Sequence, residues 1–155
     1  MIENTLAIET SCDDTSVAIV RKDGYVVGVL SANQDLAHAP YGGVVPEIAC
    51  RNHTLQILPL IEELLKKTKL NWDDVQSLSV TNRPGLIGSL IVGIVTAKSI
   101  AQVRNIPLIG VNHLEGHIVA PFLKDEQYTP PTDFDYPFLA LAVSGEQYKD
   151  LYVHH

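Results

Sequence analysis

Two histidines four residues apart, His113 and His117, have a spacing that suits metal chemistry. On a helix, residues i and i+4 lie on the same face, so both imidazoles can reach one ion. Residues 113–117 read His-Leu-Glu-Gly-His, which differs from the zinc-protease pattern His-Glu-x-x-His because the glutamate does not follow the first histidine directly. Two ligands do not complete a metal site, so a third must come from elsewhere. The alternative is a pair of ordinary polar histidines on a helix.

A polar turn at residues 9–16 carries hydroxyls and adjacent carboxylates between two short apolar segments. Backbone N–H groups and the hydroxyls of Thr10 and Ser11 can hold a phosphate. The neighbouring carboxylates of Asp13 and Asp14 can hold a hydrated Mg²⁺ that bridges to that phosphate. An ordinary polar hairpin has the same composition, so both interpretations stay open.

Gly85 and Gly88 lie where a predicted strand passes into a predicted helix. Glycines there allow close backbone approach and offer a helix N-terminus to an anion. No Gly-Lys-Ser/Thr follows, so the segment is not a P-loop. The alternative is a helix that packs on the sheet through small residues, and both can hold at once.

The other histidines and the cysteines carry less information. We interpret His38 and His53 as surface residues, and Cys12 and Cys50 as small buried residues rather than nucleophiles.

Composition excludes several classes of protein. The chain has 155 residues, 46% hydrophobic and 19% charged, which excludes intrinsic disorder as the main state. The net charge is −7, so the chain lacks the basic surface of a protein that grips nucleic acid by itself. No apolar run reaches the roughly 18 residues of a membrane span. The first four residues have no basic region or cleavage site, and two cysteines do not make a disulfide framework. We therefore expect a cytoplasmic protein without membrane contact.

The hydrophobic patterns predict an α/β fold with a mixed five-stranded sheet. An antiparallel meander comes first, with a hairpin at Asp23-Gly24, and βαβ units with flanking helices follow. Asn112 is the predicted N-cap of the third helix, and the second helix is apolar on most sides, so we expect it to be largely buried. The predicted strands are 5–9, 15–21, 25–32, 76–81, 106–111 and 138–143, and the predicted helices are 46–68, 87–103 and 112–123.

The sequence predicts three regions. Residues 1–123 form a first lobe, and residues 124–137 are an acidic, proline-containing linker. Residues 138–155 are the start of a second lobe that the chain does not complete.

Four segments together resemble one family, the TsaD/Gcp tRNA N6-adenosine threonylcarbamoyltransferases, formerly described as O-sialoglycoprotein endopeptidases. The resemblance covers residues 5–145 in order and spacing, and its blocks are Ile8-Glu9-Thr10-Ser11-Cys12-Asp13-Asp14-Thr15-Ser16, Tyr41-Gly42-Gly43-Val44-Val45-Pro46-Glu47-Ile48-Ala49, Pro84-Gly85-Leu86-Ile87-Gly88-Ser89-Leu90 and Gly110-Val111-Asn112-His113-Leu114-Glu115-Gly116-His117.

The resemblance implies an actin/Hsp70-like (ASKHA) fold of two lobes around a nucleotide cleft. It implies transfer of the threonylcarbamoyl group from threonylcarbamoyl-AMP to N6 of adenosine at tRNA position 37. His113 and His117 match the family's ligands for one iron or zinc ion. Asp13 and Asp14 match its acidic phosphate-site pair, in which the second position is usually Glu, and we expect them to act in catalysis.

The remaining expected site residues bind the nucleotide, ATP or threonylcarbamoyl-AMP, with Mg²⁺ as a further candidate ion; they are Thr10, Ser11, Gly85, Gly88, Ser144 and Gly145. The resemblance also implies tRNA, bound through a complex, and TsaB-like and TsaE-like partner proteins.

The sequence departs from the family in two respects. Residues 146–148 are Glu-Gln-Tyr where the family pattern expects Gly-His-Thr, which should weaken nucleotide binding. The family's second lobe, with its aspartate metal ligand, is not in these 155 residues, so we expect them alone not to be a competent transferase.

Two alternatives remain. The first is a catalytically inactive lobe that dimerises through its two long helices as a scaffold or binding module. The second, more remote, is a metalloprotease.

Overall fold

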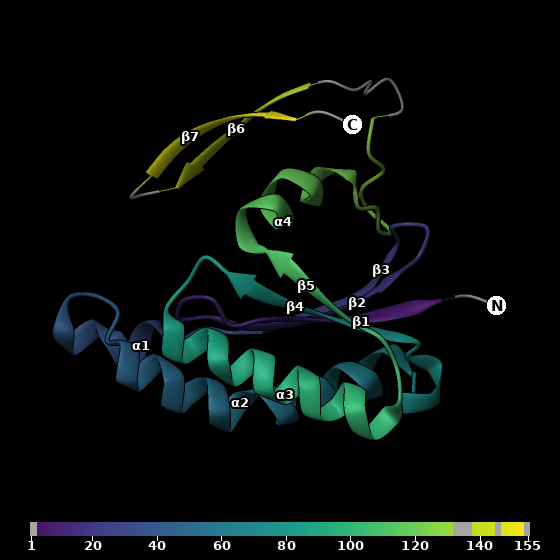
Figure 1. Cartoon of the computed structure of the whole chain (residues 1–155), viewed down its shortest axis with the longest axis horizontal. Coiled ribbons are helices and arrows are strands. Elements are labelled where there is room, and N and C mark those ends of the chain that lie inside the picture. The colour runs from purple at the N-terminus through teal and green to yellow at the C-terminus, as the bar shows by residue number, and fades with distance from the viewer. Residues whose placement is uncertain (1–2, 132–137, 145–146, 154–155) are drawn as a thin grey trace.

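A five-stranded sheet carries its two long helices on one face. The computed structural model describes residues 3–131, 138–144 and 147–153. Figure 1 shows α2 and α3 side by side beneath the sheet, while α4 and the hairpin of β6 and β7 lie on the other side. The fold is thus α/β, as the sequence predicts.

The sheet is mixed, with the strand order β3-β2-β1-β4-β5. β1 pairs antiparallel with β2, and β2 with β3, while β4 is parallel to both β1 and β5. This confirms the predicted meander followed by parallel strands. The bounds are Asn4–Glu9 for β1, Thr15–Arg21 for β2, Val26–Ala32 for β3, Ser77–Arg83 for β4 and Leu108–Asn112 for β5.

The helices confirm most of the predicted ranges. α2 is Pro46–Thr68 and α3 is Ile87–Arg104. Residues 33–45, where the sequence predicts neither a strand nor a helix, contain a short helix, α1 (Asp35–His38), and a 3-10 turn, η1 (Ala39–Tyr41). A second 3-10 turn, η2, spans Trp72–Asp74.

The third predicted helix is shorter than expected. α4 is His113–Val119, and a 3-10 turn, η3 (Ala120–Phe122), follows it directly. Pro121 has no N–H for the carbonyl four residues earlier, which ends the α-helical ladder. At the other end, the Asn112 side chain accepts a hydrogen bond from the N–H of Leu114 at 2.9 Å, so the predicted N-cap is confirmed.

The last described strands form a hairpin of their own. β6 (Phe138–Ser144) pairs antiparallel with β7 (Gln147–Val153). The ring centroids of Phe122 and Phe138 are 5.4 Å apart, so η3 contacts the start of β6. Within the predicted linker, the Lys124 N–H donates to the Gly24 carbonyl at 3.0 Å. The division into domains stays a prediction.

The core lies between the sheet and the two long helices. Alternate residues of β1 and β2 point towards the helices, and those of α2 recur at helical spacing. Each large aliphatic side chain buried here contributes about 1.5–3 kcal/mol. The members are Leu6, Ile8, Val17, Ile19, Ile57, Ile61, Leu64, Leu65, Val75, Leu78, Val80, Ala97 and Ala101.

α3 is not largely buried, which corrects the expectation from its composition. It packs on β4 and α2 through small residues such as Gly93 and Ala97 together with Leu90, and it leaves several other large apolar side chains in solvent. A helix on one face of a sheet buries only one side, and the buried side of α3 carries mostly small residues. The exposed apolar residues are Ile87, Ile91, Val95 and Val103.

The same helix bears on the expectation about membrane spans, although it contains no run of 18 consecutive apolar residues. Over 18 residues its mean hydropathy is 1.3, so by length and composition α3 meets the criterion for a spanning helix. Glycine, serine and threonine interrupt the run of apolar residues in α3, but they do not lower its mean hydropathy enough to fail that test.

The spacing of apolar residues in α2 predicts a buried stripe, of which the structure buries only part; its members are Ile48, Leu55, Leu58, Ile61, Leu64 and Leu65. Ile61, Leu64 and Leu65 are buried as expected, but Leu55 and Leu58 are 66% and 51% exposed. The buried face instead follows Ala49, His53 and Ile57 at intervals of four residues.

Candidate functional site

The turn between β1 and β2 lies against the segment that enters α3. The Thr10 hydroxyl donates to the Ser89 carbonyl at 2.8 Å, and the Leu86 N–H donates to the Ser11 carbonyl at 2.7 Å. A Cβ on Gly85 would lie 2.5 Å from the Ser11 carbonyl oxygen, so glycine is required for this approach. The predicted turn and the predicted glycine segment are therefore one structural unit.

His113, the first residue of α4, contacts the same turn. β5 ends at Asn112, whose cap starts α4, so His113 stands at the carboxyl end of the parallel strands. Its Nδ1 lies 3.2 Å from Oγ of Ser11 and 3.2 Å from Oε2 of Glu9. Three segments that are far apart in the sequence thus meet at one edge of the sheet.

The two histidines of α4 face each other. Nε2 of His113 and Nε2 of His117 are 3.1 Å apart, and the rings are nearly perpendicular with centroids 4.5 Å apart. Zinc–nitrogen bonds of about 2.0–2.1 Å at angles of 90–110° place two ligand nitrogens about 3 Å apart. The pair therefore fits two positions of one metal ion. Within residues 3–131, 138–144 and 147–153, no group of three histidine, cysteine or acidic side chains is placed to hold one.

Glu9 is a site residue to which the sequence analysis gave no role. It ends β1, where its Oε1 accepts from the Ser11 N–H at 2.5 Å and its Oε2 accepts from the Thr81 hydroxyl. Burial alone would raise the Glu9 pKa, but the hydrogen bonds from Ser11, Thr81 and His113 outweigh it, so the pKa is lowered. The signal in the sequence is a carboxylate at the last position of a strand, next to a polar turn, because such a side chain can accept hydrogen bonds from that turn.

A shallow cavity extends from Glu9 over the face of the sheet opposite α2 and α3. Its volume is about 140 Å³, and Glu9, Thr81 and Val111 are among the residues that line it. Small side chains leave this space, among them Ala7, Ser16, Ala18 and Ser79.

A family model described as "TsaD: tRNA N6-adenosine threonylcarbamoyltransferase" matches residues 26–154 of the sequence. The chain belongs to the TsaD family. The resemblance drawn from the sequence motifs is thereby confirmed.

Relatives with that description share much of the sequence. The tRNA N6-adenosine threonylcarbamoyltransferase of Bdellovibrio bacteriovorus is 64% identical over 145 residues, which are 94% of this chain and 42% of the relative. Those of Pelobacter propionicus and Acaryochloris marina are 48% and 45% identical over 140 residues, or 90% of this chain and 39% and 37% of theirs. The chain thus spans about two fifths of the length of these TsaD relatives.

A solved structure shares the fold. YeaZ from Pseudomonas aeruginosa superposes with a TM-score of 0.53 at 22% identity, covering 71% of this chain and 44% of that one. This likeness supports the fold class, an ASKHA-like α/β sheet with flanking helices.

The acidic pair of the TsaD chain lies at the outer end of the β1–β2 turn. Burial, followed by the charges of Asp13 and Asp35, raises the pKa of Asp14. Carboxylates that repel each other in this way favour a bound cation. A catalytic role for Asp13 and Asp14 stays a prediction.

Cys12 is exposed and Cys50 is half-buried, so the expectation that both are buried is wrong. The turn presents the Cys12 side chain outward because Thr10, Ser11 and Thr15 take its inward positions. Partial burial and the neighbouring charge of Asp13 raise the Cys12 pKa to about 11, which leaves the thiol protonated at neutral pH.

His53 and His38 are buried, which corrects their assignment to the surface. His53 has no exposed area, and its Nδ1 and Nε2 lie 2.7 Å from the Thr15 hydroxyl and 2.9 Å from the Cys12 carbonyl. Nδ1 of His38 accepts from the Val45 N–H at 3.2 Å. Both rings serve as polar supports for loops rather than as solvated groups, and His53 fixes the turn that carries the acidic pair.

The remaining predicted nucleotide-binding residues divide in two. The Gly88 carbonyl lies 3.6 Å from Sγ of Cys50, so Gly88 belongs to the contact between α2 and α3 rather than to the turn. Ser144 ends β6, opposite Gln147, while Gly145 and the atypical Glu146 lie outside the described residues.

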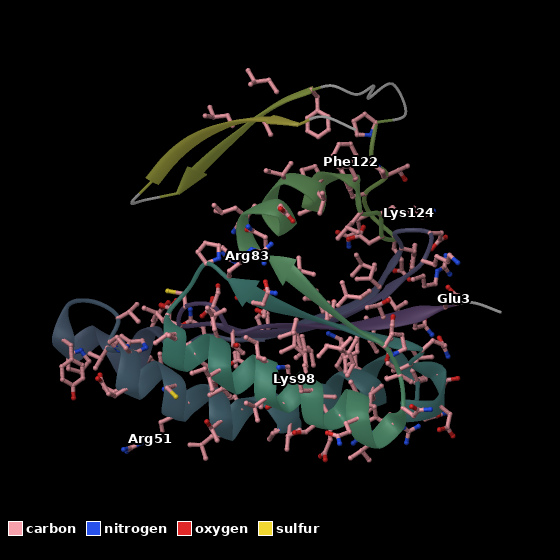
Figure 2. All side chains as sticks on the ribbon, viewed as in Figure 1. Glu3, Arg51, Arg83, Lys98, Phe122 and Lys124 are labelled. Carbon is pink, nitrogen blue, oxygen red and sulfur yellow. The ribbon has the colours of Figure 1, made fainter. Side chains whose placement is uncertain are left out.

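One positive charge stands close to this site. Arg83 is exposed at the end of β4, two residues before Gly85, and Figure 2 shows it beside α4. An exposed guanidinium at this position is a candidate ligand for an anion.

Proposed function

We propose that this chain is the nucleotide- and metal-binding part of a tRNA N6-adenosine threonylcarbamoyltransferase. The observation that carries the proposal is the meeting of Ser11, Gly85 and His113, three family motifs, at one edge of the sheet. The relatives that bear this description are longer, so the complete activity requires residues beyond the part that this chain matches.

The reaction is acyl transfer from a mixed carbamic–phosphoric anhydride to an amine. The N6 amine of adenosine 37 forms a bond to the carbamoyl carbon, and the bond from that carbon to the phosphate oxygen breaks. AMP leaves with the bonding electrons, and the proton that N6 loses passes to water. Because the donor is already activated, the protein has to orient the two reactants and stabilise the negative charge on the leaving phosphate.

The turn after β1 has the parts for holding that phosphate. Backbone N–H groups offer partial positive charge and Arg83 offers a full positive charge. Asp13 and Asp14 suit a hydrated Mg²⁺ that bridges to phosphate oxygens. The cavity that Glu9 lines offers further space, and Glu9 in turn contacts His113. In this proposal the AMP part lies at the turn and the threonylcarbamoyl part near α4.

His113 and His117 would hold an iron or zinc ion through their Nε2 atoms. Their 3.1 Å separation supports this proposal. Such an ion supplies a Lewis-acidic positive charge for a substrate oxygen when bound.

The proposal includes partners for tRNA binding. The chain's net charge of −7 does not attract a phosphate backbone, so a complex has to supply basic surface. TsaB-like and TsaE-like proteins are the proposed partners, in the cytoplasm. The exposed apolar side chains of Leu58, Ile91 and Val95 support a protein contact on the outer face of α2 and α3.

The same face also favours the second candidate, a scaffold that dimerises through these helices. Light scattering on the 155-residue chain distinguishes the two. A dimeric mass that Val95→Lys returns to the monomer would support the scaffold, and a monomeric wild type would exclude it.

A chimera tests the enzymatic proposal. The 145 aligned residues of this chain replace the corresponding segment of the Bdellovibrio bacteriovorus relative, and transfer of threonylcarbamoyl to tRNA is measured. We expect activity in the chimera, its loss in the His113→Ala chimera, and its retention in a matched Lys98→Ala chimera on exposed α3. A folded but inactive chimera would contradict the proposal.

A further inference from the structure

Both carboxylate oxygens of Glu9 accept hydrogen bonds, one from the β1–β2 turn and one from β4. Glu9 belongs to β1, accepts from the Ser11 N–H at Oε1, and accepts from Thr81 of β4 at Oε2. Its backbone position pairs with Ser16 of β2. The carboxylate therefore has a fixed place before any contact with His113 is considered.

Two groups lie 3.2 Å from Nδ1 of His113, and they differ in what they allow. The Ser11 hydroxyl can donate or accept, so it suits either tautomer of the ring. The Glu9 carboxylate can only accept, so it suits only a ring that carries its hydrogen on Nδ1. Of these two neighbours, only Glu9 selects a tautomer.

We propose that Glu9 is a positioning residue that fixes the tautomer and ring orientation of His113. With the hydrogen on Nδ1, the lone pair of Nε2 faces Nε2 of His117, where it can accept a hydrogen bond from His117 or bind the proposed ion. The opposite tautomer would place a hydrogen between the two Nε2 atoms, where the proposed metal ion belongs. This inference rests on the proposed metal-binding role of the two histidines, and carboxylates behind ligand histidines commonly act in this way.

The substitution Glu9→Gln discriminates sharply, because glutamine has one acceptor where glutamate has two. If the amide oxygen accepts from the Ser11 N–H, the amide NH₂ faces Nδ1 of His113 and donates to it. His113 then carries its hydrogen on Nε2. The reversed amide would place its NH₂ against the Ser11 N–H, which is a contact between two donors.

The first readout needs no metal. Two-bond ¹H–¹⁵N correlation spectra of the 155-residue chain at pH 8 distinguish the two tautomers of His113. We expect hydrogen on Nδ1 in the wild type and on Nε2 in Glu9→Gln. Glu115→Gln is the matched control, since it removes the same charge from exposed α4 beside the histidines, and it should keep the wild-type tautomer.

The second readout is zinc binding by titration calorimetry. Glu9→Gln should lower the affinity roughly 10- to 100-fold, as loss of a group behind a ligand histidine does. Glu115→Gln should change it much less, and His117→Ala should abolish binding at this site.

The outcomes separate the two proposals. Hydrogen on Nε2 in the wild type, or the same tautomer in wild type and Glu9→Gln, overturns the role of Glu9. Zinc binding that His117→Ala leaves unchanged overturns the metal-binding role of the histidines, while the tautomer comparison still decides the role of Glu9. If Glu9→Gln does not fold, hydrogen on Nε2 of His113 in the wild-type spectrum would still overturn the role of Glu9.

Discussion

Nδ1 of His113 lies 3.2 Å from Oε2 of Glu9, although the two residues are 104 positions apart in the sequence. The contact joins the end of β1 to the first turn of α4. Since Glu9 is also bound to Ser11 and Thr81, one carboxylate connects the polar turn, the central strands and the proposed ligand helix.

Replacement of Gly85 tests the contact between the turn and the α3 entry. The new Cβ of Gly85→Ala would lie 2.5 Å from the Ser11 carbonyl oxygen, so the two segments must separate. We expect a loss of about 1–3 kcal/mol in the free energy of unfolding, measured in urea. Gly43→Ala is the control, since nothing lies within 4 Å of its added Cβ. Equal stability of the two variants would contradict the close approach.

His53→Ala removes the two hydrogen bonds by which the His53 ring holds the acidic turn. The Thr15 hydroxyl and the Cys12 carbonyl lose a buried partner, at about 1–3 kcal/mol, and a cavity adds to this. Urea unfolding should show the loss. Arg51→Ala on the same helix should have little effect, because Arg51 points away from the sheet (Figure 2).

Alkylation of Cys12 should be slow at neutral pH. A pKa of about 11 instead of 9.0 lowers the thiolate fraction at pH 7 about 100-fold. In a Cys50→Ala background, the iodoacetamide rate should rise about tenfold per pH unit up to pH 10. Asp13→Asn should accelerate the reaction, because it removes a charge that raises the pKa. A rate that levels off near pH 8 would disprove this account.

Glu9 should make stability depend on acid pH. Its folded pKa lies below the ordinary value of 4.5, so its stabilisation is complete above that pH and is lost as the pH falls through the folded pKa. The difference in unfolding free energy between wild type and Glu9→Gln should therefore shrink from pH 7 to pH 3. A difference that stays constant would mean that the carboxylate is not held as described.

Much of the fold follows from local patterns. α2 has the predicted bounds because Pro46 suits the first helical turn and Lys69, at φ +57°, ends the helix. The Asp23-Gly24 hairpin holds because Gly24 takes φ +80°. The burial of α3 was mispredicted because hydropathy does not say which face of a helix meets the sheet.

The site is harder to predict because its contacts cross the sheet. The family motifs identified His113 and Ser11, but the partnership of Glu9 with Thr81 depends on how β1 and β4 are paired. His53 was missed because a polar side chain on a predicted helix is ordinarily assigned to solvent. Its spacing of four from Ala49 and Ile57 indicates the buried face only once that face is known.

The parallel pairing of β1 with β4 has a consequence for synthesis of the chain. Thr5 and Ser77 are partners 72 residues apart, so the meander of β1, β2 and β3 leaves the ribosome first. At about 5–20 residues per second, β1 waits on the order of 4–14 seconds for its second neighbour. During that interval β1, which ends at Glu9, is an unpaired edge strand that can pair with another nascent chain.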